Sequence, residues 1–170
     1  GRGSDAVVDA STCDCCQTDV AVTDRGPLLV YRDRGEDEVR DIASARFEGG
    51  RWTSPTTVHV DGWQVSACPV NGPAVAARGN AAVVAWYSEA GGTPAVRLAR
   101  STDAGDRYAA PVVVDQGTAV TGQVDVALDG DQAWVAWLRE DATWQTLMLA
   151  RYAPDLSKPL QRIEVARPAG

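Results

Sequence analysis

Four cysteines are the residues of this chain best suited to specific chemistry. Cys13, Cys15 and Cys16 lie within four residues of one another, and Cys68 follows far along the chain. Such a set predicts either two disulfides or a thiolate site for a soft metal, copper or zinc. We take structural disulfides as the first interpretation, with a bridge from Cys68 and a second pairing inside the cluster as one arrangement. Adjacent Cys15 and Cys16 are poorly placed to pair with each other.

A run of charged residues from Arg32 to Asp41 is the densest charge cluster in the sequence. Exposed charged loops ordinarily form weak ion pairs, so the cluster gains interest only if it lies beside the cysteines. Its candidate catalytic residues are Arg32, Arg34, Glu36 and Asp37.

Two further candidates flank Cys68. Trp63 could stack on a sugar ring or cap the cysteine loop, and Asn71 offers a polar amide. Together with Arg32 and Arg34 they form the predicted ligand-binding set, for which a glycan is a possible partner.

The composition excludes some classes of protein. A net charge of −7 would repel a phosphate backbone, so we expect no nucleic-acid partner. No run approaches the roughly eighteen apolar residues that span a bilayer, so we expect no membrane span. The even number of cysteines favours an oxidising compartment, and we predict that the chain is secreted or periplasmic.

An internal repeat indicates the elements that must position these residues. The segments are VAVTDRG at 20–26, PAVAARG at 73–79 and VDVALDG at 124–130, and each precedes an apolar, aromatic-bearing run. A second run then ends in Ala-Arg, at Arg46, Arg100 and Arg151. A period near 50 residues made of short strands is typical of propeller blades.

Alternating apolar residues and turn signals predict four antiparallel strands in each repeat. The fold class is therefore all-β, a single partial β-propeller over 1–170. Its expected parts are a leading cysteine segment at 1–18 and blades at 19–60, 61–115 and 116–166. The expected strands are 19–24, 27–33, 39–47 and 52–60; 73–78, 81–88, 94–101 and 108–115; 123–129, 132–139, 144–152 and 160–166.

One turn carries a resemblance to a known family. The segment from Ser101 through Asp103 and Gly105 to Tyr108 resembles the Asp-box of sialidase-like (BNR-repeat) six-bladed propellers. Its residues suit a turn, because Asp103 can accept backbone hydrogen bonds and Gly105 can take a positive φ. The first repeat keeps a degenerate version at 46–52, and the third has lost it. We expect the Asp-box to be structural.

The resemblance also implies a functional face. In this family the loops between the second and third strands, and the connections between blades, lie opposite the Asp-box turns. All four cysteines, Trp63 and the loop from Arg32 to Asp41 would then share one face.

Sialidases of this fold use three arginines, a tyrosine nucleophile with a glutamate, and an aspartate. The Arg-Ile-Pro motif of true sialidases is missing here, so no arginine is assigned to the triad. Tyr31 occupies the repeat position of Trp86 and Trp137, which predicts a core aromatic. Hydrolysis of acidic sugars by this chain is accordingly an alternative hypothesis, and a purely structural scaffold is another.

Three blades do not close a ring. We therefore predict a partner that supplies the missing half, either the same polypeptide or a second copy in a homodimer. The preferred hypothesis is an extracytoplasmic sialidase-like propeller module whose cysteine-rich face is disulfide-stabilised or binds a soft metal.

Overall fold

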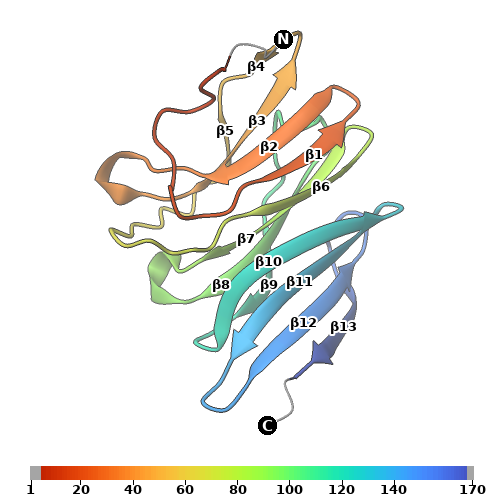
Figure 1. Cartoon of the computed structure of the whole chain (residues 1–170). Coiled ribbons are helices and arrows are strands. Elements are labelled where there is room, and N and C mark those ends of the chain that lie inside the picture. Colours follow the sequence, from red (N-terminus) through yellow and green to blue (C-terminus); the bar gives the residue numbers. More distant parts are fainter. Residues whose placement is uncertain (1–4, 168–170) are drawn as a thin grey trace.

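The computed structural model describes residues 5–167 and shows three antiparallel β-sheets that follow one another from the N-terminal to the C-terminal end (Figure 1). The strands of the second and third sheets pair in chain order, and in the first sheet the last two short strands both pair with the third. The all-β class and the three four-stranded antiparallel units predicted from the repeat are confirmed. No helix in the described residues is long and apolar enough to cross a membrane.

The first sheet contains a split strand. Its elements are β1 (Asp19–Thr23), β2 (Gly26–Arg32), the 3₁₀ turn η1 (Glu36–Glu38), β3 (Ile42–Glu48), β4 (Arg51–Trp52) and β5 (Thr56–His59). Both β4 and β5 pair with β3, so together they occupy the place of the single predicted strand 52–60. Pro55 lies in the gap and has no N–H to donate, which explains the interruption.

The second and third sheets follow the same plan. Their elements are β6 (Ala74–Arg78), β7 (Ala81–Ser88), η2 (Ala90–Gly92), β8 (Ala95–Ser101), β9 (Val112–Gln116), β10 (Val120–Asp129), β11 (Gln132–Glu140), β12 (Gln145–Tyr152) and β13 (Pro159–Ala166). Strand β9 starts after Pro111, later than predicted. Strand β10 starts earlier, because a bulge with positive φ at Gly122 and Gln123 lets pairing resume beyond it.

Side chains that alternate along the strands pack each sheet against the next. Leu28, Val30 and Ile42 of the first sheet meet Val84 and Trp86 of the second in one buried cluster. The opposite face of the second sheet packs on the third in another, which includes Val83, Leu98, Val126, Val135 and Trp137. The middle sheet is thus covered on both faces, whereas each outer sheet has one face that no other sheet covers.

A buried aromatic on the second strand of every sheet donates a hydrogen bond to a carboxylate from the chain segment before that sheet. Trp86 Nε1 lies 2.6 Å from Asp61 Oδ2, and Trp137 Nε1 lies 2.8 Å from Asp115 Oδ2. In the first sheet the Tyr31 hydroxyl donates to Asp9 Oδ2 at 2.7 Å. Tyr31 is buried, as its repeat position predicts.

Asp115 makes the fold sensitive to acid. Burial alone would raise the pKa of Asp115, but hydrogen bonds from Trp137, Arg162 and Arg139 outweigh burial and hold this pKa below its usual range. A depressed folded-state pKa stabilises the fold above the unfolded value of about 4, and this contribution is lost as the pH falls through the folded pKa.

We therefore expect Asp115→Asn to lower the free energy of unfolding at pH 7 by about 2 kcal/mol and to flatten its fall below about pH 4. Urea unfolding between pH 3 and pH 7 measures both effects. The exposed Asp129→Asn is the matched control. An acid slope unchanged by Asp115→Asn would contradict the assignment.

The segment at 101–108, which resembles an Asp-box, forms a tight turn that packs against the first sheet. Ser101 Oγ accepts the Gly105 N–H at 2.9 Å, and Asp103 Oδ1 accepts the Arg107 N–H at 3.0 Å. Gly105 has a φ of +88°, and a Cβ there would lie 2.6 Å from a methyl carbon of Leu28. The Tyr108 hydroxyl donates to Ser44 Oγ of β3 at 2.9 Å. These contacts are those of a structural turn.

Candidate functional site

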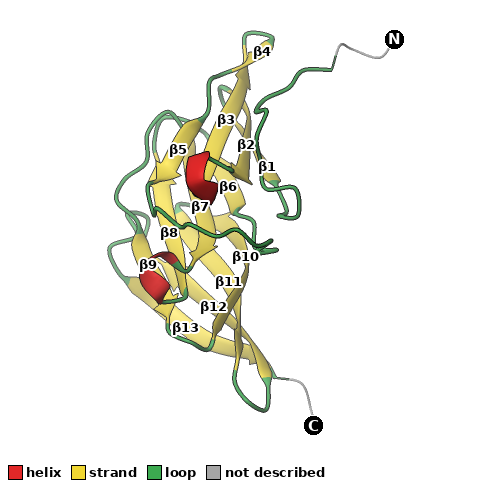
Figure 2. Cartoon of the chain, turned by 90° about the vertical axis from the view of Figure 1, so that its left-hand side faces the viewer, coloured by secondary structure: helices red, strands yellow, loops and turns green. Residues whose placement is uncertain are grey.

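The loops that join the second and third strands of the sheets lie on one side of the molecule. Figure 2 shows η1 and η2 there, and Figure 1 shows the β11–β12 turn at the same edge. The segment that leads into the second sheet meets the first of these loops, because Val39 forms a β-bridge with Gln64 and Arg40 N–H donates to Trp63 O at 2.8 Å.

The four cysteines come together at this side in two pairs. Cys13 pairs with Cys16, with Cα atoms 5.6 Å apart, and Cys15 pairs with Cys68 at 6.2 Å. No cysteine is free. Of the arrangements that the sequence left open, the structure has one bridge to Cys68 and one inside the cluster. Cys13 is buried and Cys68 is exposed, so the site extends from the interior to the surface.

A buried arginine supports the inner cysteine. Arg40 donates to Cys13 Sγ at 3.2 Å, to the Val65 carbonyl at 3.1 Å and to Glu38 Oε2 at 2.7 Å. Hydrogen bonds from Arg34 and Arg40 lower the pKa of Glu38. The guanidinium thus joins the cysteine cluster to the charged loop and to the segment that leads into the second sheet.

Gln17, directly after the cysteine cluster, hydrogen-bonds to the segment that follows Cys68. The Gln17 amide donates to the Gly72 carbonyl at 3.1 Å and accepts the Gly72 N–H at 2.8 Å. A Cβ at Gly72 would lie 1.9 Å from the Gln17 carbonyl oxygen, so only glycine fits this approach. The contact therefore joins the same two segments that the Cys15–Cys68 bridge joins.

Asn71 lies at the meeting point of the three sheets. Its side chain accepts the Gln123 N–H at 2.8 Å and donates to the Thr121 carbonyl at 3.1 Å, both on β10. Its own carbonyl accepts from Arg32 Nε at 2.8 Å. Asn71 is buried, and its amide is occupied by these backbone partners.

Arg32 is fully buried in the same region. Besides Asn71, its guanidinium donates to the carbonyls of Arg40 and Tyr87, each at 2.6 Å. Burial lowers the pKa of Arg32 to about 10. Three backbone carbonyls therefore use the donors that the sequence interpretation assigned to a ligand or a substrate.

Trp63 packs inside and not on the surface. The Arg32 guanidinium carbon lies 4.8 Å from the centre of its ring, and the Tyr87 ring meets it edge to face at 5.7 Å. With both neighbours in place, the indole is covered. This environment favours interior packing over stacking on a sugar.

The remaining charged candidates are exposed. Arg34 pairs with Glu38 at 2.7 Å, whereas Glu36 and Asp37 lie in η1 at the surface. Arg32 and Arg34 are therefore not joined in one cluster, since one is interior and the other is paired at the rim. Burial and the contact with Asp9 raise the pKa of Tyr31, which leaves its phenol a hydrogen-bond donor and not an activated nucleophile.

Three of the cysteine sulfurs are close enough together to bind one metal ion. The Sγ atoms of Cys13, Cys15 and Cys16 all lie within 4.8 Å of one another, and Cys68 is bonded to Cys15. Reduction of both bridges would release thiolates in one place, and thiolates suit zinc or copper(I).

The sequence placed Glu38 and Arg40 in the charged loop on this face and Gln17 beside the cysteines, but it assigned none of the three a role of its own. The signal for Gln17 was its place directly after the cysteines, with a glycine near Cys68 as its partner. Arg40 looked like one of several loop charges, because its burial depends on contacts with residues far along the chain.

No protein-family model matches the chain, and no curated protein resembles it significantly.

Proposed function

We propose that this chain is a module of a sialidase-like β-propeller, with its three sheets as consecutive blades and a disulfide-stabilised binding face. The strand order within each sheet, the repeat near 50 residues and the Asp-box turn against the neighbouring sheet support the propeller.

The observation that carries the function is the joining of two distant loops by cysteines at the face where the inter-sheet connections meet. Cys15 and Cys68 are 53 residues apart, and their bridge holds the leading segment against the connection into the second sheet. Disulfides persist in oxidising compartments, so the module functions outside the cytoplasm. Its rim presents Arg34, Glu36 and Asp37 to a polar ligand or partner.

Thiol counting tests this proposal directly. The denatured protein, alkylated without reductant, is expected to show no free thiol, and peptide mapping is expected to recover the Cys13–Cys16 and Cys15–Cys68 bridges. After full reduction, four thiols are expected. Four reactive thiols before reduction would reject a disulfide-stabilised face.

A soft-metal site is the second candidate, favoured by the three clustered sulfurs. Elemental analysis of the purified protein and titration of the reduced protein with zinc or copper(I) test it. One tightly bound ion per chain, lost when Cys13 and Cys16 are replaced with serine, would support the metal site. No binding by the reduced protein would leave disulfides as the sole role.

A further inference from the structure

Arg46, near the end of the third strand of the first sheet, hydrogen-bonds to the turn between the third and fourth strands of the second sheet. Arg46 donates to the Ala104 carbonyl in the β8–β9 turn, and it pairs with Asp106 at 2.8 Å. Arg100, one repeat later, donates to the Pro154 carbonyl in the β12–β13 turn. The same repeat position therefore makes the same contact at both junctions between sheets.

The third copy of this arginine, Arg151, contacts no such turn among the described residues. Arg151 Nε is buried and has no hydrogen-bond partner among the described residues, and its Nη1, the atom that binds the turn in the other two copies, makes only a long contact of 3.4 Å with Gln132 Oε1 of its own sheet. Its guanidinium carbon lies over the Trp134 ring at 5.3 Å. A buried donor without an acceptor is costly, so this position is suited to a carbonyl from outside the chain.

The sheet face around Arg151 is apolar and incompletely covered. It carries Trp134, Ala136, Leu138, Leu147 and Leu149, on β11 and β12. The same positions of the second sheet, such as Val83, Ala85 and Leu98, are completely buried by the third sheet. The third sheet thus presents the face that its predecessors use to receive another sheet.

The first sheet presents the complementary face at the other end of the chain. Val22 of β1 is 72% exposed, whereas Val75 and Val126, at the same repeat position, are 6% and 8% exposed. Phe47 is 38% exposed and its equivalent Tyr152 is 5% exposed. In the later sheets the preceding sheet covers these positions.

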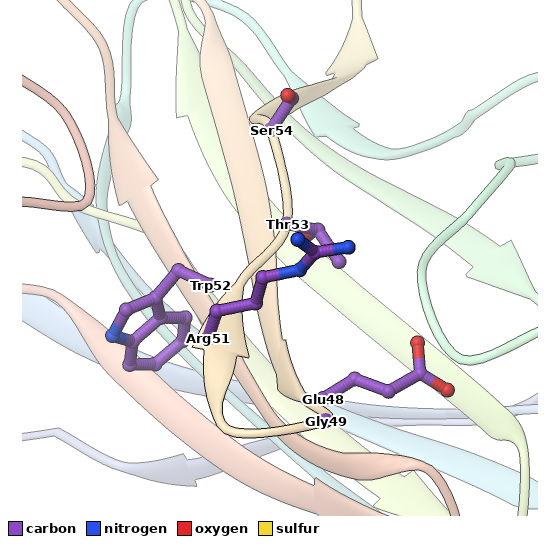
Figure 3. Close-up of a pocket in the computed structure, with 6 residues that line it drawn as sticks. All are labelled: Glu48, Gly49, Arg51, Trp52, Thr53 and Ser54. Atoms are coloured by element: carbon purple, nitrogen blue, oxygen red, sulfur yellow. The ribbon is translucent and has the colours of Figure 1, made fainter.

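The turn that would receive Arg151 lies beside this face. Phe47 and Trp52 pack edge to face with ring centres 5.5 Å apart, on the β3–β4 hairpin. Figure 3 shows that Trp52 and Glu48 extend to opposite sides of this hairpin, next to a pocket of about 670 Å³. The exposed Gly49 and Gly50 leave the hairpin backbone open to a donor.

The first sheet also supplies its own carboxylate. Asp115 of β9 accepts the hydrogen bond from Trp137 of the next sheet, but Ala166 occupies the corresponding position of β13. Tyr31 does not need a carboxylate from a preceding sheet, because Asp9 of its own chain already accepts its hydroxyl. The two free faces are therefore compatible without an aspartate in β13.

We propose that the free face of the third sheet binds the first sheet of a second copy of this chain, with Arg151 on the β3–β4 hairpin of that copy. Two such head-to-tail contacts close two chains into one ring of six sheets. The proposal rests on the propeller arrangement proposed above but not on the cysteine site. A second copy is the occupant because one chain carries both faces: Val22 and Phe47 are exposed on one, and the apolar side chains of the other are half-buried.

Sedimentation equilibrium of the 170-residue chain tests the proposal. We expect a mass twice the 18.0 kDa of one chain. Leu149→Glu on the third sheet and Val22→Glu on the first sheet should each raise the dissociation constant roughly 100-fold or more, because each places a charge in an apolar contact. Val113→Glu, at an exposed position of the middle sheet, is the control and should leave the dimer intact.

Mixing the two face variants distinguishes head-to-tail assembly from other dimers. Each variant alone should be monomeric, whereas the mixture keeps one intact contact and should dimerise measurably. Circular dichroism verifies that both variants are folded, and neither residue is buried in the monomer. A monomeric parent chain, or a dimer that only one of the two variants disrupts, would overturn the proposal, while the thiol and metal measurements would stand on their own.

Discussion

Replacing both Cys15 and Cys68 with serine is expected to lower the free energy of unfolding by about 4 kcal/mol, the largest effect of any change at the cysteine site. The bridge joins residues 53 apart, so its loss restores a large loop-closure entropy to the unfolded chain. The Gln17–Gly72 hydrogen bonds would remain, but without the covalent link they must hold the two segments alone. Guanidinium unfolding under non-reducing conditions measures the difference.

The matched control replaces Cys13 and Cys16 with serine. This pair spans three positions of the chain, so the same entropy argument predicts a loss of only about 2 kcal/mol. Each double variant leaves one complete pair, which avoids a free thiol that could exchange. If both double variants lost the same free energy of unfolding and both also lost a bound metal, the cysteines would form a thiolate metal site instead. If replacing Cys15 and Cys68 left the free energy of unfolding unchanged, the Cys15–Cys68 bridge would not stabilise the fold.

Arg32→Lys should destabilise the protein by about 3 kcal/mol or more, although it keeps the positive charge. Lysine has one ammonium group and cannot reach the carbonyls of Asn71, Arg40 and Tyr87 together. The substitution would leave buried carbonyls without donors around a charge that is itself buried. Urea unfolding at pH 7 measures the loss.

Arg34→Lys provides the comparison within the same loop. Arg34 is exposed and pairs with Glu38 at the surface, where an ion pair contributes under about 1 kcal/mol. We expect its replacement to change stability by less than about 0.5 kcal/mol. If Arg32→Lys lowered the free energy of unfolding no more than Arg34→Lys does, Arg32 would not be a structural residue. Its predicted role in ligand binding would then be favoured.

Local pattern was sufficient for much of the fold. Alternation along runs such as 132–139, turn glycines and a period near 50 residues predicted three four-stranded antiparallel units, because pleat and turn chemistry act over short distances. Errors lay where a strand meets a proline or a bulge, at Pro55, Pro111 and Gly122, and at 39–41, where Val39 pairs with Gln64 so that β3 begins only at Ile42. The interior position of Tyr31 followed from its repeat position, since equivalent positions of a repeat meet equivalent neighbours.

The candidate site was only partly predictable. The four cysteines and the charged loop are visible in the sequence, and the repeat predicts that they share a face. The pairing of the cysteines and the burial of Arg32, Trp63 and Asn71 emerge only when distant segments pack together. The reason is physical: whether an arginine faces solvent or three carbonyls depends on segments up to 55 residues away, whose approach no local pattern encodes.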